Sequence, residues 1–79
     1  MELYRAELTQ EESDDLNKRF TYHPVKPGQN DIYSNLRGEA RALAGHIITV
    51  SPPSRERSLA LTKLEECIMW ANAGIARNT

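Results

Sequence analysis

The stretch that decides the fold is Ser51-Pro52-Pro53-Ser54, which separates two long runs of helical sequence. Consecutive prolines lack the backbone donors that a helix needs and disfavour helical backbone in the residue before them, so one helix ends here. Ser54 then predicts the N-cap of the next helix, with Glu56 in its first turn. Because so short a link makes the two helices antiparallel neighbours, the sequence predicts a helical hairpin.

Apolar residues on both sides of this link recur at alternating spacings of three and four, which is the pattern of one helix face. The run before the link predicts a helix over about 30–50, with Asn30 or Asp31 as its N-cap. The run after it predicts a helix over about 54–77. The apolar residues expected to face the other helix are Ile32, Leu36, Ala40, Leu43, Ile47 and Val50, and then Leu61, Leu64, Ile68, Ala71 and Ile75.

The first part of the chain predicts one more helix. Thr9 and Glu12 have the spacing of a capping box, so a short helix is expected over about 10–20, after an N-terminal extension over 1–9. Two prolines and a glycine after this helix predict a loop. The predicted fold class is therefore all-α: one domain over 1–79, with a short first helix and a long antiparallel hairpin.

A chain of 79 residues has little interior to stabilise it. The single cysteine, Cys67, excludes an internal disulfide, and one cysteine with two widely spaced histidines is a poor ligand set for structural zinc, so no metal or cofactor is expected. Cys67 and Gly74 belong to a row of small residues that lets another helix approach closely, and we expect Cys67 to be buried there. The remaining source of stability is other copies of the chain, which predicts a homo-oligomer.

Charge and hydropathy exclude several classes of partner. Ten Lys and Arg residues against eleven Asp and Glu give a net charge of −1, whereas proteins that bind nucleic-acid polymers are usually basic. No apolar run approaches the roughly 20 residues of a membrane span, and the first residues lack the pattern of a signal peptide. We therefore expect a cytosolic protein that binds neither a nucleic-acid polymer nor a membrane.

Catalytic motifs are absent from the sequence. It contains no recognisable nucleophile–base pair, no metalloprotease motif and no glycine-rich phosphate-binding loop. The adjacent Glu65 and Glu66 point about 100° apart on a helix and cannot form a two-carboxylate site within one chain. We propose no catalytic residue and do not expect an enzyme.

Cationic and aromatic residues near the loop are better suited to binding. The candidates in this region are Arg19, Tyr22, His23, Lys26 and Arg37. The Tyr22 ring can stack on a nucleobase, and the planar guanidinium of Arg37 suits a phosphate. On a protein that is not basic, this combination favours a small anionic ligand that carries bases. The alternative interpretation is structural: Tyr22 packs on the hairpin, and the arginines form surface ion pairs with Glu39 or Asp31.

Three further residues stand out near the end of the last helix. Trp70 falls off the main apolar row, so we expect it to pack against a neighbouring subunit or against the helix over 10–20. Asn72 is either a surface residue or a ligand contact. Arg77 either frames an anion or complements the negative end of its helix.

Three strings of residues also carry a family resemblance. They are RFTYHP at 19–24, YSNLR at 33–37, and the long run 54–73, which begins Ser-Arg-Glu and ends Trp-Ala-Asn-Ala. Over about residues 17–77 the chain resembles the small phage anti-CBASS proteins of the second type. These are cyclic-nucleotide sponges whose hairpin domain is shared with a Thoeris anti-defence sponge.

The resemblance implies a helical hairpin that assembles into a hexamer and acts in the cytoplasm of an infected bacterial host. It implies binding of cyclic dinucleotides, such as 3′,3′-cyclic GMP-AMP, between protomers, and of cyclic trinucleotides at separate sites on three-fold axes. These messengers would be withheld from host effectors without being cleaved. Tyr22 matches the tyrosine that stacks on the bases, Arg37 a basic residue that meets the phosphates, and Arg77 an arginine of the trinucleotide site. A helical scaffold protein and a phosphodiesterase for the same ligands remain as alternatives.

Overall fold

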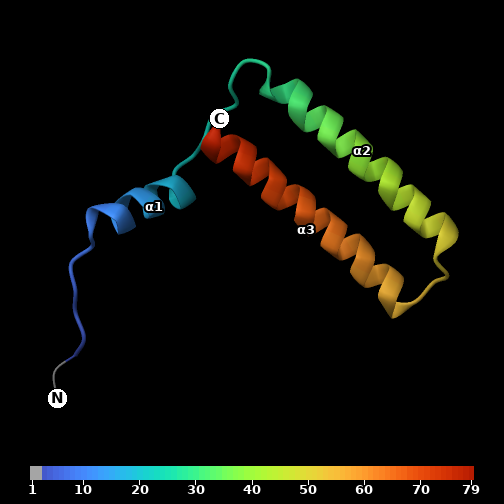
Figure 1. Ribbon diagram of the computed structural model, residues 1–79, viewed down its shortest axis with the longest axis horizontal. Helices are drawn as coiled ribbons and strands as arrows, with labels where there is room; N and C mark the ends of the chain where they lie inside the picture. Colours follow the sequence, from blue (N-terminus) through green and yellow to red (C-terminus); the bar gives the residue numbers. More distant parts are fainter. Residues whose placement is uncertain (1–2) are drawn as a thin grey trace.

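The computed structural model describes residues 3–79, which form three α-helices and no strand (Figure 1). The helices are α1 (Gln10–Phe20), α2 (Gln29–Val50) and α3 (Arg55–Asn78). Helices α2 and α3 run antiparallel, side by side, and α1 projects away near the open end of this hairpin (Figure 1). The predicted all-α fold, with a short first helix and a long hairpin, is confirmed.

The turn between α2 and α3 is held by Ser54 and Arg57. Ser51 is extended, at φ −111° and ψ 124°, and ends α2 before the two prolines. Ser54 Oγ accepts the backbone N–H of Arg57 at 3.1 Å, so it caps α3, which begins at Arg55, one residue later than predicted. Arg57 Nη1 donates to the carbonyl oxygens of Ser51 at 3.2 Å and Ile48 at 3.4 Å. These bonds use carbonyl groups that the end of α2 leaves without helical partners.

Helix α2 follows a tight turn and has no side-chain cap at its first residue. The backbone N–H of Gln29 donates to the carbonyl oxygen of Lys26 at 3.0 Å. Gly28, at φ 86° and ψ −18°, takes the second central position of a type II turn, where a side chain would be strained. The predicted N-cap at Asn30 or Asp31 is therefore wrong: Gly28 holds that position, and α2 begins at Gln29, one residue earlier than predicted.

The predicted capping box at the start of α1 is confirmed. Thr9 Oγ1 accepts the backbone N–H of Glu12 at 3.1 Å, and Glu12 Oε1 accepts that of Thr9 at 2.9 Å. The bond from the Thr9 backbone, assisted by the Thr9 side chain, lowers the pKa of Glu12 below its usual 4.5. The short helix thus begins on a cap of its own.

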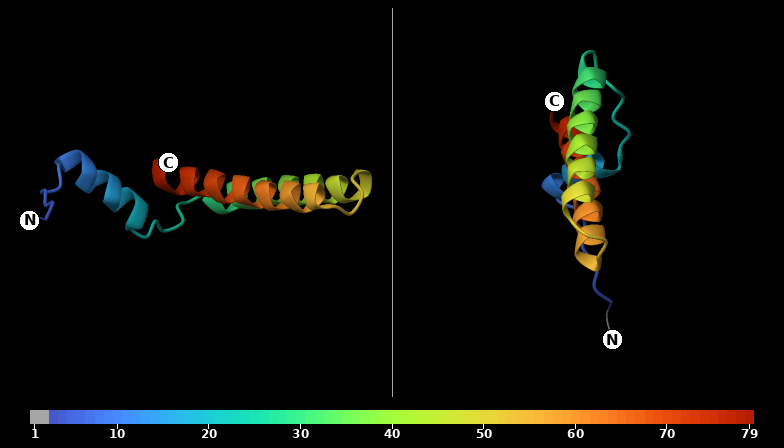
Figure 2. Two further views of the ribbon diagram at one scale, coloured as in Figure 1. Left: turned by 90° about the horizontal axis from the view of Figure 1, so that it is seen from below. Right: turned by 90° about the vertical axis from the view of Figure 1, so that its right-hand side faces the viewer.

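The hairpin is a single layer of helices (Figure 2). The thinnest dimension of the molecule is 14 Å, only a little more than the diameter of one helix, about 10–12 Å. Each helix is therefore covered along one side only. The half-buried side chains along the middle of α2 and α3 are Tyr33, Leu36, Ala40, Ala44 and Ile47, and Leu61, Leu64 and Ile68. Among residues 3–79 no apolar residue is fully buried, so one chain has no closed hydrophobic core.

Several residues predicted to be covered are exposed instead. Ile32 and Leu43 are each half exposed, and Val50 is more so. Cys67 is also exposed, so the prediction that it is buried is wrong for the single chain. The physical reason is that two helices share only a narrow line of contact, and in α2 this line passes through Ala44 and not Leu43.

The surface of the chain is larger than its mass requires. It exposes 6975 Å², whereas a compact protein of 9.0 kDa exposes about 4,900 Å². Large apolar side chains form much of this surface, including Met69 and Trp70 on α3. Within the described range, none of the helices has the length and apolar character that crossing a membrane requires.

The capping box makes α1 sensitive to acid. Because the pKa of Glu12 is lowered in the folded chain, its stabilising effect is present above about pH 4.5 and is lost as the pH falls through the lowered value. Thr9→Pro removes the N–H that Glu12 accepts, and the φ of −72° at Thr9 already suits proline. We expect an NMR titration to show the Glu12 pKa rising toward 4.5 in this variant. An unchanged titration curve would contradict the capping box.

Candidate functional site

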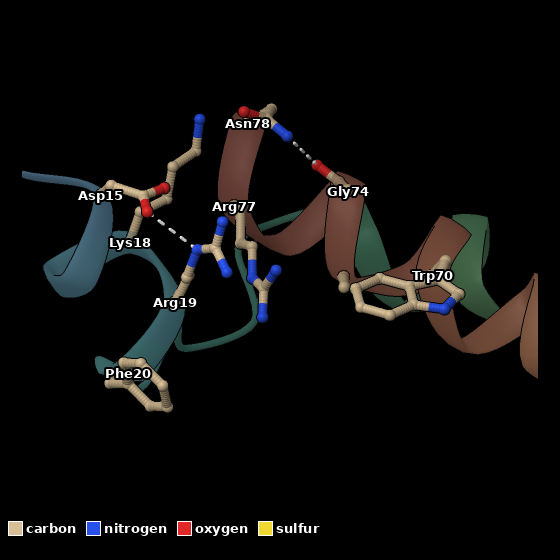
Figure 3. Close-up of a pocket in the computed structure, with 9 residues that line it drawn as sticks. Asp15, Lys18, Arg19, Phe20, Trp70, Gly74, Arg77 and Asn78 are labelled. Carbon is tan, nitrogen blue, oxygen red and sulfur yellow. Dashed lines mark hydrogen bonds and ion pairs between the residues drawn. The ribbon is translucent and has the colours of Figure 1, made fainter. Parts of the chain in front are cut away.

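An open groove lies between the end of α1 and the end of α3, and we refer to it as the α1–α3 groove (Figure 3). Its volume is about 530 Å³. The residues that line it are Asp15, Lys18, Arg19, Phe20, Trp70, Ala73, Gly74, Arg77 and Asn78. The last turns of two helices thus bring three cationic and two aromatic side chains to one concave surface.

The charge of the α1–α3 groove is positive. Arg19 Nε pairs with Asp15 Oδ2 at 2.9 Å, which neutralises one of the three cations. Lys18 and Arg77 form no ion pair with any described residue and remain available to an anion. Trp70 is 65% exposed, so its indole adds an open ring face beside these charges (Figure 3). A ligand that carries both a phosphate and a base fits this chemistry.

Helical spacing explains which residues of α3 line the α1–α3 groove. Trp70, Gly74 and Arg77 stand at i, i+4 and i+7 and therefore share one face. Gly74 carries no side chain, and nothing lies within 4 Å of where its Cβ would stand. Asn78 Nδ2 donates to the Gly74 carbonyl oxygen at 3.0 Å and completes the end of α3 (Figure 3).

A second groove runs along one face of the hairpin, and we refer to it as the hairpin groove. Its volume is also about 530 Å³. The residues that line it are Arg37, Ala40, Arg41, Ala44, Ile48, Leu61, Leu64, Glu65, Ile68, Met69 and Asn72. Most of these side chains are aliphatic, and two arginines four residues apart on α2 give the groove a cationic edge.

Asn72 contributes an unsatisfied polar atom to the hairpin groove. Its Oδ1 is buried and has no hydrogen-bond partner among the described residues. A buried acceptor without a donor costs about 1–3 kcal/mol. Because this oxygen is covered within the single chain, a donor from another molecule reaches it only if the Asn72 side chain moves.

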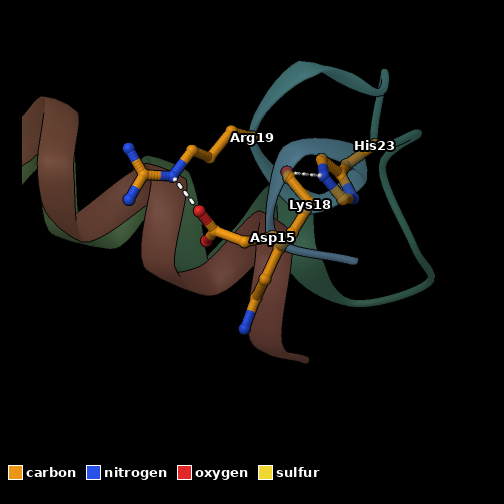
Figure 4. A network of polar contacts seen from close by, with 4 residues as sticks. All are labelled: Asp15, Lys18, Arg19 and His23. Atoms are coloured by element: carbon orange, nitrogen blue, oxygen red, sulfur yellow. Dashed lines mark hydrogen bonds and ion pairs between the residues drawn. The ribbon is translucent and has the colours of Figure 1, made fainter. Parts of the chain in front are cut away.

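The loop between α1 and α2 presents the third group of predicted residues. Tyr22 is 82% exposed and does not pack on the hairpin. His23 lies against α1, where its Nε2 donates to the carbonyl oxygen of Lys18 at 2.8 Å (Figure 4). This bond uses one of the free carbonyl groups at the end of α1. Lys26 Nζ donates to the main-chain oxygen of Thr79, at the end of α3.

The seven predicted ligand-binding residues therefore occupy three places on one chain. Arg19 and Arg77 line the α1–α3 groove, and Arg37 and Asn72 line the hairpin groove. The others, Tyr22, His23 and Lys26, lie on the loop and line neither groove. One chain thus does not gather these residues into a single pocket.

Arg19 forms a surface ion pair, with Asp15, and Arg77 lies in the last turn of α3, so the structural alternatives fit these two residues, whereas Arg37 and Trp70 give them no support in the single chain. Arg37 makes no ion pair with Glu39 or Asp31, since the two ion pairs within residues 3–79 lie elsewhere. Trp70 is exposed in the groove and is not packed beneath α1. No cluster of His, Cys, Asp and Glu side chains suited to a metal ion is found in this part of the chain.

Trp70 and Arg41 line the grooves but were not predicted as ligand contacts, although their spacing from other candidate residues could have indicated them. Trp70 lies seven residues, or two helical turns, before Arg77, which places both on one face. Arg41 lies four residues after Arg37 and joins it at the edge of the hairpin groove. Lys18 has no such signal, because it reaches its groove only through the placement of α1.

The fold and its grooves define a small helical binding domain with open cationic surfaces. Residues 12–76 match the family described as the Acb2/Tad1 hairpin domain. The match covers most of the chain, and the protein belongs to this family. At the level of the family, membership implies a cyclic-nucleotide sponge. Comparisons with curated proteins and with solved structures give no match.

Proposed function

We propose that the protein binds cyclic dinucleotides, such as 3′,3′-cyclic GMP-AMP, and holds them without cleaving them. It acts in the cytoplasm of an infected bacterium, where it keeps these messengers from the effectors of CBASS immunity. It works as a homo-oligomer, a hexamer by analogy with the family, and binds cyclic trinucleotides at a separate site. The family membership supports the sponge activity, and the chemistry of the surfaces supports the ligand class.

The observation that carries this proposal is the separation of the candidate residues. Tyr22 offers an exposed aromatic face on the loop, and the Arg37 guanidinium on α2 pairs with no carboxylate among the described residues. A cyclic dinucleotide has two bases and two phosphates. A symmetric contact between two copies supplies two tyrosines and two arginines, whereas one chain supplies half of that set.

The α1–α3 groove supplies a second surface for nucleotides. Arg77 lies there, five residues after Asn72 on α3, and does not line the hairpin groove that contains Arg37. Three copies around an axis would place three Arg77 side chains near three phosphates, which is the arrangement a cyclic trinucleotide requires. We therefore assign Arg77 to the trinucleotide and Tyr22 with Arg37 to the dinucleotide.

Recovery of the ligand separates this proposal from its alternatives. The protein is incubated with 3′,3′-cyclic GMP-AMP, separated from free nucleotide, digested with protease, and the released nucleotide is analysed by chromatography. Intact ligand released only after digestion supports a sponge. Cleaved nucleotide would identify a phosphodiesterase, and no retained nucleotide would favour a helical scaffold whose apolar faces bind protein alone.

Loss of the Tyr22 ring is expected to weaken dinucleotide binding. Stacking of a base on an aromatic side chain contributes about 1–3 kcal/mol, so Tyr22→Ala lowers the affinity roughly 5- to 150-fold. Arg37→Ala lowers it as well, because a phosphate loses its guanidinium. Isothermal calorimetry measures both effects. The matched controls are Tyr4→Ala and Arg5→Ala, since both residues are exposed and lie outside the matched family range. Wild-type affinity in Tyr22→Ala and Arg37→Ala would refute the assignment.

Loss of the Arg77 side chain is expected to separate the two ligands. Arg77→Ala weakens binding of a cyclic trinucleotide and leaves dinucleotide affinity unchanged, because the two ligands contact different surfaces. Calorimetry with each ligand in turn measures the difference, with Arg55→Ala, at the exposed start of α3, as the control. Equal losses for both ligands would show that they share one site.

A further inference from the structure

The loop that carries Tyr22 is fastened to the end of α3 by three residues, Lys26, Gln29 and Thr79, which we call the clasp. Gln29 Nε2 donates to Thr79 Oγ1 at 2.9 Å, and Lys26 Nζ donates to the main-chain oxygen of Thr79. Lys26 belongs to the loop and Gln29 is the first residue of α2, so these two bonds join the loop and the start of α2 to Thr79, the residue after α3. The clasp therefore closes the end of the hairpin opposite to the Ser54 turn.

Gln29 is at the centre of the clasp. It is 5% exposed and is the one buried residue in the described chain. Both ends of its side-chain amide are used, because Oε1 accepts the backbone N–H of Lys26 at 2.9 Å while Nε2 reaches Thr79. Thr79 Oγ1 in turn donates to the carbonyl oxygen of Ile75. A buried amide with all these partners holds the loop and the helix end in one arrangement.

We propose that Gln29 and Thr79 are positioning residues that set the place of the Tyr22 loop before ligand binds. The inference rests on the proposed function, in which the Tyr22 ring stacks on a base. Before Lys26 in the loop, the side chain of His23 donates a hydrogen bond to α1. That bond does not fix the loop against the hairpin. Without the clasp, the ligand must order the loop itself, and that ordering reduces affinity.

The clasp also gives Lys26 a role that needs no ligand. Its amine is engaged by Thr79 within the chain, and its backbone N–H by Gln29. Lys26 therefore helps to hold the loop in place, and its role as a ligand contact stays a prediction.

Thr79→Val tests the clasp with little risk to the fold. The substitution keeps the shape of the side chain and removes the hydroxyl that Gln29 contacts, at the last residue of the helical hairpin. Thr79→Ser restores a hydroxyl and is the conservative rescue. Thr49→Val is the matched control, because Thr49 Oγ1 also donates to a carbonyl near a helix end, that of His46, and joins no other element.

Two measurements are made on each purified full-length variant. Hydrogen exchange without ligand reports the mobility of residues 21–29, with the turn at 51–54 as an internal reference. Calorimetry with 3′,3′-cyclic GMP-AMP reports affinity. We expect Thr79→Val to speed exchange in the loop alone and to weaken binding roughly 2- to 10-fold, the effect of one hydrogen bond. Thr79→Ser and Thr49→Val keep both values at wild type.

Three results would overturn the proposal. In the first, hydrogen exchange of residues 21–29 is the same in Thr79→Val as in Thr49→Val. In the second, exchange is faster in Thr79→Val but binding is unchanged, and in the third, Thr79→Ser does not restore the wild-type values. A wild-type protein that retains no dinucleotide overturns the proposed function instead. The ligand-free exchange rates then decide whether the clasp exists, so the two failures are distinct.

Discussion

One constraint governs the rest of this structure: two helices side by side form a single layer, and a single layer cannot enclose a core. The molecule is 14 Å thick at its thinnest, and none of its described apolar residues is fully buried. Stable domains usually pack two layers around one hydrophobic interior. The apolar faces of α2 and α3 lack a second layer in the single chain, and in the homo-oligomer that we propose other copies of the chain supply it.

The same constraint shapes the binding surfaces. Each groove is open, and each holds only part of the chemistry that a cyclic nucleotide requires. Arg37 shares the hairpin groove with the exposed apolar side chains of Ile48 and Met69, so one contact between copies would cover apolar surface and bring a second chain close to Arg37. In the proposed homo-oligomer, association would supply both the missing layer and the missing half of each pocket, which would link the shortness of the chain to its function.

Much of the fold could be predicted from local chemistry. The two prolines after Ser51, the Ser54 cap and the Thr9 capping box act within a few residues, and the structure contains all three. The N-cap of α2 was predicted wrongly because a type II turn, with Gly28 at positive φ, replaced a side-chain cap. The exposure of Cys67 was missed because a small residue in a helical row does not reveal whether a partner covers it within one chain.

The candidate site was less predictable than the fold. The cationic and aromatic residues could be selected by type, but their division between two grooves and a loop depends on where α1 lies and on the clasp at Gln29. Neither has a local signal, since the bonds from Lys26 and Gln29 to Thr79 span about 50 residues and link segments that only the closed hairpin brings together.

The mass of the protein in solution shows whether the chain folds only when several copies associate. Light scattering over a dilution series, with helical content followed by circular dichroism on the same samples, measures whether folding and association go together. We expect a helical particle with a mass several times the 9.0 kDa of one chain, and we expect its helical signal to fall when dilution separates the copies. A stably helical particle of 9.0 kDa would contradict this expectation.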